Sequence, residues 1–445
     1  MSAHRVVVVG GGLAGLFTAS ELVAAGVDDV VVLEQASLPG GVARTIQRDG
    51  YSLEPAAGTL LLPHPHLSDV LGRLGAEVLP AEAAAALRYV YTGGRLVTLA
   101  SSPKALAAPL VPFPAKARAA AEPFIRSRPA TPDESLDAFL RRRLGGGLGG
   151  MLASLAASGV FAGDPTRLSA RSSFPLFPAL EDEAGSIVRG GLRRARSRRS
   201  GGRRTRPTGH LPVGGMQGVV RAAVSRLGDR LRSGRQVTAV RPDGAGWAVE
   251  DGEILTAEHL VLAIPPDRAA GLVGGDLGEV LRRAVTAPVV VLGLGGPAGR
   301  FPLPAGFGAL IGPDAGMVTL GILFESSYAP ERAPAGHSLA KVIAGGARRP
   351  ELVEWDDARL VETIGAEVAR ALGSDLDVSY VEVVRHPAGI PQYEVGHGDW
   401  LTEVDRLRAA RPGLHLTGWG YRGVGVAHVA TDAVRTAGEI AGVGG

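Results

Sequence analysis

A run of four valines that passes directly into a glycine cluster is the feature that most constrains the fold of this chain. Residues 6–16 read VVVVGGGLAGL, and Gly10, Gly12 and Gly15 satisfy the pattern G-x-G-x-x-G. Valines favour a buried strand, and the glycines allow a tight turn, close approach of a pyrophosphate and close packing of the next helix. A helix pattern and a second strand follow up to residue 34. The sequence therefore predicts a βαβ unit that binds a nucleotide at its turn.

A carboxylate at the end of the second strand indicates the kind of nucleotide. Glu34 follows the glycines by about twenty residues, the separation expected of a group that accepts hydrogen bonds from a ribose 2′-hydroxyl. An arginine or a neutral residue there would favour a 2′-phosphate. The start of the intervening helix offers N–H groups to the phosphates. The motif predicts an adenine dinucleotide, with NAD and FAD both open.

The composition excludes several kinds of chemistry. The 445 residues include no cysteine, which rules out disulfides, thiolate metal sites, a thiol nucleophile and a flavin attached through sulfur. His64-Pro65-His66 is too short a motif for a metal site, so we interpret it as a loop and expect no metal. The length is sufficient for two or three domains with buried cores.

Most of the positive charge excess lies in residues 193–206, RRARSRRSGGRRTR, where no apolar periodicity is visible. This segment predicts a solvated, flexible loop, with membrane lipid as the next interpretation and nucleic acid as the last. Residues 144–163 are uncharged but rich in Gly, Ala and Ser, which favours a buried helix preceded by a glycine loop over a transmembrane helix. The first residues do not resemble a signal peptide, so we expect a cytoplasmic protein.

The remaining pattern alternates between helices and strands without an internal repeat. Residues 103–143 are helical and interrupted by prolines, which leaves a membrane-facing surface and an ordinary helical cap both open. Short antiparallel strands are predicted near residues 235–254, with turns at Asp243-Gly244 and Asp251-Gly252. Further strands are expected within residues 289–345, followed by a helix at residues 356–373, a strand near residue 414 and a final helix.

Several segments resemble the protoporphyrinogen oxidases, a family within the flavin amine-oxidase superfamily. After Glu34, the glycine pair Gly40-Gly41 with Thr45 and Glu54 resembles the superfamily loop that wraps FAD. The family-like segments are VFAGDPTRLSARSSFP (160–175), GHLPVGGMQGVV (209–220), GIPQYEVGH (389–397) and LHLTGWGYRGVGVAHVATDAVRTAGEI (414–440). They occur in the family's order over nearly the whole chain. By itself, the Ile-Pro-Gln-Tyr segment would be an ordinary turn and His397 a packing residue.

The chain departs from the family pattern in three places, all of which concern cofactor contacts more than the fold. Val42 stands where many members carry Arg or Lys, although Arg44 lies nearby. The family's Glu-x-Gly-Pro is Glu-Pro-Ala-Ala at residues 54–57, and its Asn-Asp pair is Ala-His at residues 427–428.

The resemblance implies an α/β fold with three parts. These are a Rossmann-type FAD-binding domain of the p-hydroxybenzoate hydroxylase or amine-oxidase kind, a mixed α+β substrate domain and a helical membrane-facing domain. The expected boundaries are 1–85, 205–272 and 396–445 for the first, 86–103 and 273–395 for the second, and 104–204 for the third.

The resemblance also implies non-covalent FAD held by three separated parts of the chain. The expected contacts are Gly10, Gly11, Gly12, Leu13, Ala14, Gly15, Glu34, Gly41, Val42, Ala56, Ala57, Gly58, Thr59, Val237, Gly418, Val424, Gly425 and Val426.

The implied reaction is oxidation of protoporphyrinogen IX to protoporphyrin IX, a late step of haem synthesis. A hydride passes from a meso carbon to FAD, and dioxygen accepts the electrons with release of hydrogen peroxide. No catalytic side chain is expected, because the flavin supplies the chemistry. Lys104 is the candidate cation for a substrate propionate, in place of the family's arginine, and Leu320 and Gly321 are expected to line the macrocycle.

Three other kinds of function stay open: a coproporphyrinogen oxidase, another enzyme of the superfamily, and a non-enzymatic scaffold. A coproporphyrinogen III oxidase would need more basic residues for a substrate with four carboxylates. An amine oxidase would need an aromatic cage, for which Trp419 and Tyr421 are candidates, and a carotenoid desaturase is a further superfamily option. A non-enzymatic nucleic-acid or membrane scaffold would use residues 193–206. We expect peripheral contact with the inner face of the cell membrane and no nucleic-acid partner; a homodimer stays open.

Overall fold

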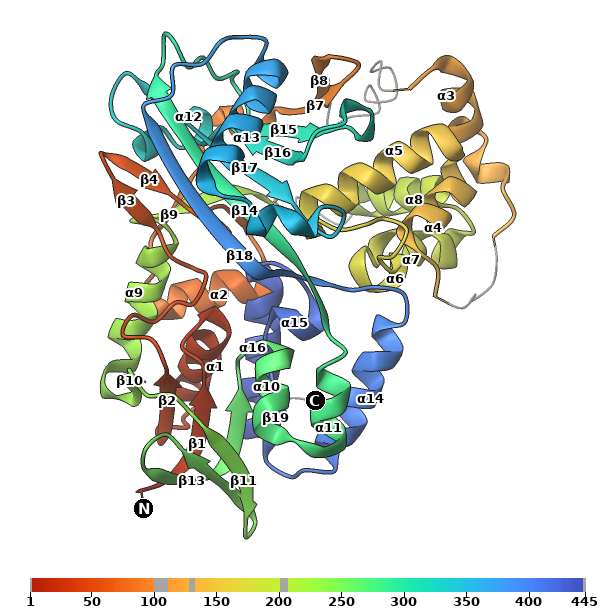
Figure 1. The fold of residues 1–445 in the computed structure, drawn as a ribbon. Helices are drawn as coiled ribbons and strands as arrows, with labels where there is room; N and C mark the ends of the chain where they lie inside the picture. Colours follow the sequence, from red (N-terminus) through yellow and green to blue (C-terminus); the bar gives the residue numbers. More distant parts are fainter. Residues whose placement is uncertain (1, 100–110, 128–132, 201–206, 443–445) are drawn as a thin grey trace.

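The described residues form two sheets of seven strands each, two smaller sheets and several groups of helices (Figure 1). The computed structural model describes residues 2–99, 111–127, 133–200 and 207–442. In Figure 1 the first sheet lies in the lower half and the second sheet above it. The helices of residues 113–200, called the helical unit below, lie to the upper right.

The predicted βαβ unit forms the centre of the first sheet. The four valines of residues 6–9 are between 0% and 6% exposed, because helices cover both faces of the strand that contains them. The predicted hairpins also form, as an antiparallel extension of this sheet. In spatial order the strands are β10 (Leu231–Ser233), β2 (Val30–Glu34), β1 (Ser2–Val9), β13 (Ile254–Leu262), β12 (Gly246–Glu250) and β11 (Ala239–Asp243), and β19 (Leu414–Leu416) pairs with β13.

Two groups of helices sandwich the first sheet. Their apolar side chains meet alternate residues of β1, with Val6 and Val8 on one face and Val7 and Val9 on the other. The first face carries α1 (Leu13–Ala24), α2 (Pro65–Leu74), α9 (Gly215–Leu227) and α16 (Val426–Ala441). The second face carries α10 (Pro266–Val273), α11 (Gly275–Leu281) and α14 (His397–Ala409).

The second sheet is mostly antiparallel, and helix α13 (Asp357–Leu372) packs on one face through Leu360, Ile364 and Val368. Its two longest strands, β14 and β18, run diagonally through the middle of Figure 1. In spatial order the strands are β18 (Tyr380–Gln392), β14 (Val285–Pro297), β17 (His337–Gly345), β16 (Thr319–Leu323), β15 (Gly308–Ile311), β7 (Arg88–Thr92) and β8 (Arg95–Leu99).

Two small sheets lie between the larger ones. The first contains β3 (Ile46–Arg48) and β4 (Tyr51–Leu53), and the second contains β5 (Leu60–Leu62), β9 (Thr208–Pro212) and β6 (Val78–Pro80). The second small sheet joins two distant parts of the chain, because β9 pairs with strands about 130 or more residues earlier.

The helical unit has its own core and a buried ion-pair cluster. Arg143 is 0% exposed and pairs with Glu122 and Glu181. Its elements are α3 (Phe113–Ala120), η3 (Glu122–Phe124), α4 (Leu136–Leu144), α5 (Gly146–Ala156), the π-helical turn η4 (Ala157–Phe161), α6 (Ala170–Ser173), α7 (Leu176–Ala184) and α8 (Ile187–Ser200).

The prediction of a flexible loop at residues 193–206 is wrong for its first half, because residues 193–200 belong to α8. Arginine and alanine are good helix formers, and the Ser186 hydroxyl accepts a hydrogen bond from the N–H of Arg189 in the first turn of α8. Glu183 also pairs with Arg194. A polar helix anchored in this way needs no apolar periodicity, which is why the pattern was uninformative. Residues 201–206 lie outside the described residues.

The buried helix predicted within residues 144–163 is present as α5, but the predicted glycine loop before it is wrong, because α5 begins at Gly146, within the glycine run. A Cβ at Gly149 would lie 2.3 Å from the carbonyl oxygen of Leu140, so the missing side chain allows α5 to pack closely on α4. Across the four described ranges, no helix combines the length and the apolar character that crossing a membrane requires.

His64-Pro65-His66 begins helix α2 and is not the loop that the sequence suggested. The N–H of Leu67 donates to His64 Nδ1 at 3.3 Å, and Pro65 occupies the first turn, where its missing N–H is not needed. In the part of the chain that the structure describes, no three His, Asp or Glu side chains are grouped so that they could hold a metal ion.

Candidate functional site

The glycine turn after β1 leaves the start of α1 open to a ligand. Gly10 has a φ of +107°, and a Cβ at Gly15 would lie 1.9 Å from the carbonyl oxygen of Gly10, so both positions require glycine. A Cβ at Gly12 would meet nothing within 4 Å, and Gly12 has no side chain to cap the helix that begins at Leu13. The first N–H groups of α1, those of Leu13 and Ala14, therefore face a site suited to phosphate.

Glu34 closes one side of this turn. Its Oε2 atom accepts from the N–H of Gly11 at 2.6 Å, and its Oε1 atom accepts from the N–H of Ala36 at 2.8 Å. Each carboxylate oxygen retains a lone pair that could accept from a ribose hydroxyl. The N–H of Arg235 donates to the Glu34 carbonyl oxygen at 2.8 Å, which brings the half-buried Val237 close to the same edge.

The second glycine pair lies directly against the first. The N–H of Gly40 donates to the carbonyl oxygen of Gly11 at 2.7 Å, and Gly41 has a φ of +59°. A Cβ at Gly41 would lie 3.5 Å from the Cα of Gly12. Val42, at the position where the family pattern often has a cation, is 43% exposed. The structure thus brings Gly41 and Val42 beside the glycine turn, as their proposed role requires.

Glu54 joins this region to the middle of the chain. It is 1% exposed, accepts from the Thr45 hydroxyl at 2.8 Å, and accepts from the N–H of Met216 at 3.2 Å. A Cβ at Gly215 would lie 2.1 Å from Glu54 Oε1, which explains the Gly-Gly-Met sequence at the start of α9. Burial raises the pKa of Glu54, although Arg332 opposes the shift. The sequence marks Glu54 as a motif residue, but no local pattern indicates that its carboxylate caps helix α9.

The C-terminal turn meets the N-terminal one. A Cβ at Gly418 would lie 3.5 Å from the Cβ of Ala14. Gly418 and Gly425 have φ values of +123° and +111°, and α16 begins directly afterwards, at Val426. No side chain caps this helix. Its first N–H groups and those of Val424 and Gly425 can therefore donate to a ligand without competition from a capping side chain. The C-terminal turn that precedes α16 therefore lies against the start of α1, and both helices have uncapped starts.

Asp432 and Tyr393 hold the C-terminal turn, and sequence analysis assigned no role to either side chain. Asp432 Oδ2 accepts from the Thr417 hydroxyl and from the N–H of Gly418, both at 2.9 Å. The Tyr393 hydroxyl accepts from the N–H of Gly423 at 2.7 Å and donates to the carbonyl oxygen of Trp419. The Ile-Pro-Gln-Tyr motif was the signal that could have identified Tyr393.

His397 supports the same turn from the opposite side of Tyr393. Its ring stacks on that of Tyr393 with centroids 4.1 Å apart, and its Nε2 atom lies 2.9 Å from the carbonyl oxygen of Tyr421. Burial lowers the pKa of His397, which favours the neutral ring with its proton on Nε2. His397 is therefore a satisfied packing residue that also orients the turn.

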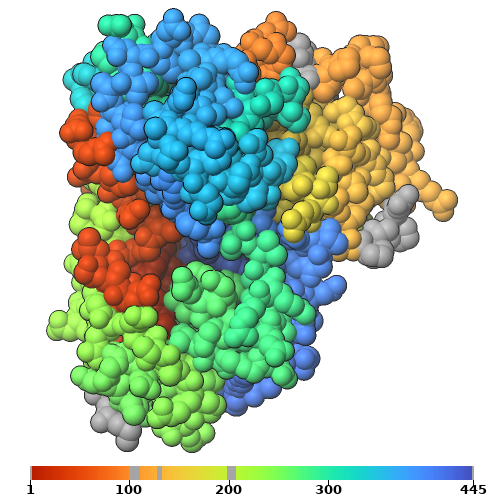
Figure 2. All heavy atoms as spheres, viewed as in Figure 1, coloured from red at the N-terminus to blue at the C-terminus, as the bar shows by residue number. Residues whose placement is uncertain are grey.

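The remaining predicted cofactor residues form the segment before β5. Ala57 is exposed, Ala56 and Thr59 are half-buried and Gly58 is buried. The carbonyl oxygen of Gly58 accepts from Arg332. Figure 2 shows a hollow between the red-orange N-terminal segment and the green segment of α10 and α11, with dark-blue C-terminal atoms at its base. The three parts of the chain that the sequence singled out therefore surround one region.

The predicted substrate residues lie on the second sheet. Leu320 and Gly321 are buried on β16, and Leu320 packs with Ala162 and Val289. This apolar cluster joins the second sheet to the helical unit, since the N–H of Ala347 donates to the carbonyl oxygen of Ala162 at 2.8 Å. Lys104 lies outside the described residues.

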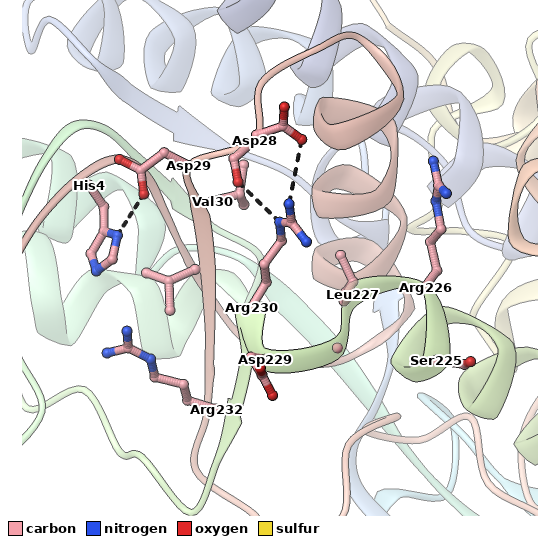
Figure 3. A pocket seen from close by; sticks show the side chains of 12 residues that line it. His4, Asp28, Asp29, Val30, Ser225, Arg226, Leu227, Asp229, Arg230 and Arg232 are labelled. Atoms are coloured by element: carbon pink, nitrogen blue, oxygen red, sulfur yellow. Dashed lines mark hydrogen bonds and ion pairs between the residues drawn. The ribbon is translucent and has the colours of Figure 1, made fainter.

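A second hollow, of about 390 Å³, lies at the amino ends of the parallel strands of the first sheet, opposite the glycine turn (Figure 3). His4 and Asp29, which line it, stand at the amino ends of β1 and β2, whereas Gly10 follows the carboxyl end of β1. Two ion pairs lie in it: His4 Nδ1 lies 2.8 Å from Asp29, and Arg230 lies 3.4 Å from Asp28. Nucleotides bind at the carboxyl ends of parallel strands, so this hollow is not the dinucleotide site.

The residues around the glycine turns fit FAD. They provide an open helix start at α1 for a pyrophosphate, a second uncapped helix start at α16, a carboxylate for a ribose and glycine-lined space next to the backbone. Together with the two sheets, this arrangement defines a flavoprotein fold of the amine-oxidase kind.

Comparison with known proteins identifies the family. The model for flavin containing amine oxidoreductases matches residues 13–441, and the chain belongs to this family. It is an enzyme that uses FAD, and the absence of cysteine excludes attachment of the flavin through sulfur. The predicted fold class is confirmed, while the membrane-facing role of the helical unit stays a prediction.

Particular relatives carry porphyrinogen oxidase names. The chain is 29% identical to the chloroplastic protoporphyrinogen oxidase of Oryza sativa subsp. japonica, covering 98% of this chain and 87% of that protein. It is 26% identical to the coproporphyrinogen III oxidase of Bacillus subtilis, covering 95% and 94%. A crystal structure from Exiguobacterium sp. 255-15, named provisionally as a protoporphyrinogen oxidase, superposes with a TM-score of 0.83 at 22% identity and covers 99% of both chains.

Proposed function

We propose that this enzyme oxidises protoporphyrinogen IX to protoporphyrin IX with dioxygen as the electron acceptor. The observation that carries the proposal is the apolar cluster of Ala162, Val289 and Leu320, with Ile343 and Ile390 packed against it. It lies where the second sheet meets the helical unit, and its neighbour Ile390 lies three residues before Tyr393, which holds the C-terminal turn of the flavin site. A large apolar macrocycle needs such a surface. The porphyrinogen oxidase names of both curated relatives support the same substrate class.

When bound, the flavin would supply the redox chemistry in three two-electron rounds: in each round it would accept a hydride from the macrocycle, which also loses a proton, and one dioxygen would take the two electrons and two protons to give one hydrogen peroxide. The protein's part is to hold the ring and the macrocycle together and to exclude water. Backbone groups perform most of this task, since the proposed cofactor residues are mainly glycine, alanine and valine. No side chain of the glycine turns is placed to act as an acid or base.

Coproporphyrinogen III is the second candidate substrate, and Arg348 is the observation that favours it. Arg348 is exposed, its Nη2 atom donates to the Ser158 hydroxyl at 3.2 Å, and no carboxylate of the described residues pairs with it. It therefore offers a guanidinium for a substrate carboxylate beside the apolar cluster. Lys104 stays our proposed cation for a propionate, and a substrate with four carboxylates would use both.

The amine-oxidase alternative receives little support from the aromatic residues. Tyr421 is 1% exposed, and its ring lies nearly parallel to that of Trp400, with centroids 6.1 Å apart, inside the core of the first sheet. It cannot form an aromatic cage with Trp419 around an amine while it is buried there.

We also propose that the helical unit touches the inner face of a membrane. Phe113 and Phe124 are 80% and 83% exposed, and Leu192 on the arginine-rich helix α8 is 54% exposed. Aromatic side chains beside arginines suit a surface with anionic lipid. Replacing Phe113 and Phe124 by Ser should reduce co-sedimentation with anionic vesicles while leaving FAD content unchanged; unchanged co-sedimentation would contradict this proposal.

The purified enzyme tests the main proposal. It should be yellow, and under air it should convert protoporphyrinogen IX into fluorescent protoporphyrin IX with formation of hydrogen peroxide. Parallel assays with coproporphyrinogen III decide between the two substrates through kcat/KM. A yellow protein that leaves both porphyrinogens unoxidised would refute the proposal.

A further inference from the structure

Four carbonyl oxygens of residues 54–58 point toward side chains of the second sheet and its connections. Lys341 Nζ donates to the carbonyl oxygens of Glu54 and Ala56, each at 3.1 Å. His386 Nε2 lies 3.1 Å from the carbonyl oxygen of Pro55, and Arg332 donates to that of Gly58. Residues 54–58 are called the ledge below.

These side chains come from three different elements. Lys341 lies on β17, His386 lies on β18, and Arg332 belongs to the short helix η7 (Pro330–Arg332). All of the ledge's observed donors thus lie on the side of the second sheet. The other side of the ledge carries the exposed Ala57, and the Glu54 carboxylate caps α9 at Met216. The ledge therefore separates the second sheet from the flavin site.

Lys341 is the central donor in this arrangement. It is 3% exposed, and its ammonium lies 3.2 Å from Oε1 of Glu325, a carboxylate that is 0% exposed and also pairs with Arg332. An ammonium has three protons, and here its three neighbours are Glu325 and two carbonyl oxygens of the ledge. A buried charge is costly unless it is fully paired, so this lysine is held in one place.

We propose that Lys341 is a positioning residue for the flavin: through the carbonyl oxygens of Glu54 and Ala56, it fixes the ledge against which the isoalloxazine ring binds. The inference extends the proposed function, since a fixed ring is what a hydride-transfer reaction requires. It concerns the flavin side of the reaction and not the choice of porphyrinogen.

The test compares Lys341→Met, which keeps a similar length but has no donor, with Lys341→Arg, which can still donate to two carbonyl oxygens. FAD is titrated into each apoprotein, and the visible absorption bands of the bound flavin are recorded. In Lys341→Met the Kd for FAD should rise by about tenfold or more, because two buried carbonyl oxygens lose their donor. The absorption bands should also shift, and Lys341→Arg should recover most of the affinity.

Arg143→Met is the matched control, since Arg143 is an equally buried, ion-paired cation in the helical unit. It should lower the unfolding temperature without changing the Kd for FAD. The proposal is overturned if Lys341→Met binds FAD within about twofold of the wild type. It is also overturned if Lys341→Met and Arg143→Met raise the Kd for FAD by the same factor. Should Lys341→Met fail to fold, Lys341→Gln removes the charge and shortens the donor, and an unchanged Kd and spectrum in that variant would also overturn it.

The outcome is independent of the substrate assignment. FAD affinity and the flavin spectrum are measured without any porphyrinogen, so an enzyme that fails to oxidise porphyrinogens would refute the proposed function while leaving this test intact.

Discussion

Replacing Tyr393 by phenylalanine should loosen the C-terminal turn of the flavin site. The ring of Tyr393 is 2% exposed and packs against His397, so Phe preserves its packing. The hydroxyl accepts from the N–H of Gly423 at 2.7 Å and donates to the carbonyl oxygen of Trp419. Tyr393→Phe therefore removes two hydrogen bonds and little else.

The expected magnitude follows from the two backbone groups left without a partner. A buried polar group that loses its partner costs about 1–3 kcal/mol. Because both of these hydrogen bonds are only partly buried, the free energy of unfolding of the FAD-bound enzyme should fall by about 2–4 kcal/mol, the lower part of the range for two groups. The groups belong to the turn between Gly418 and Gly425, beside the proposed cofactor residues. If about half of this decrease in the free energy of unfolding comes from weaker binding of FAD, the Kd for FAD rises by roughly tenfold.

Two measurements separate these effects. Urea unfolding with and without saturating FAD gives the stability change, and titration of the apoprotein with FAD gives the Kd. Tyr89→Phe is a control, because the Tyr89 hydroxyl donates to the carbonyl oxygen of Ala305 at 2.9 Å in the second sheet, far along the chain from the turn. The reasoning is refuted if Tyr393→Phe binds FAD as tightly as the wild type and unfolds at the same urea concentration.

Three further changes test other parts of the structure. Gly15→Ala should abolish FAD binding, because its Cβ would lie 1.9 Å from the carbonyl oxygen of Gly10; a purified variant with normal flavin absorption would contradict this. Burial and His259 lower the pKa of His415 to about 4, below the value of about 6.5 in the unfolded chain. The unfolded state therefore binds more protons than the folded state between pH 6.5 and 4, so the free energy of unfolding falls as the pH is lowered through this range. In His415→Gln, unfolding temperatures measured across the same range should depend less strongly on pH. Arg348→Glu should raise KM for the porphyrinogen about tenfold with kcat and FAD content nearly unchanged, and an unaltered KM would remove Arg348 from substrate binding.

Local patterns predicted the parts of the fold that depend on neighbouring residues. The valine run, the glycine turn and the hairpins at Asp243 and Asp251 are recognisable because each one depends on a few consecutive side chains. Helix α8 was missed, because its stability comes from Ser186 and Glu183 and not from an apolar stripe.

The flavin site could be predicted only in part. Resemblance to a family gave the three segments that surround it, and the structure brings them together. The contacts that hold those segments were not predictable: Lys341 reaches carbonyl oxygens nearly 300 residues earlier in the chain. No local pattern relates a lysine on a strand to a carbonyl oxygen on a distant loop. The proposed contacts of the eighteen cofactor residues with FAD, the domain boundaries and the role of Lys104 stay predictions.

The position of the C-terminal turn has a consequence for how the enzyme matures. β19 pairs in parallel with β13, and Gly418 lies beside Ala14, so the two ends of the chain form one wall of the flavin site. The C-terminal turn lies about 400 residues later in the chain than the glycine turn that it contacts. Until residues 414–426 pack next to β13 and Ala14, the cofactor has only part of its site. Folding of the N-terminal βαβ unit is therefore not sufficient for complete FAD binding, and the site matures only when these distant segments have met.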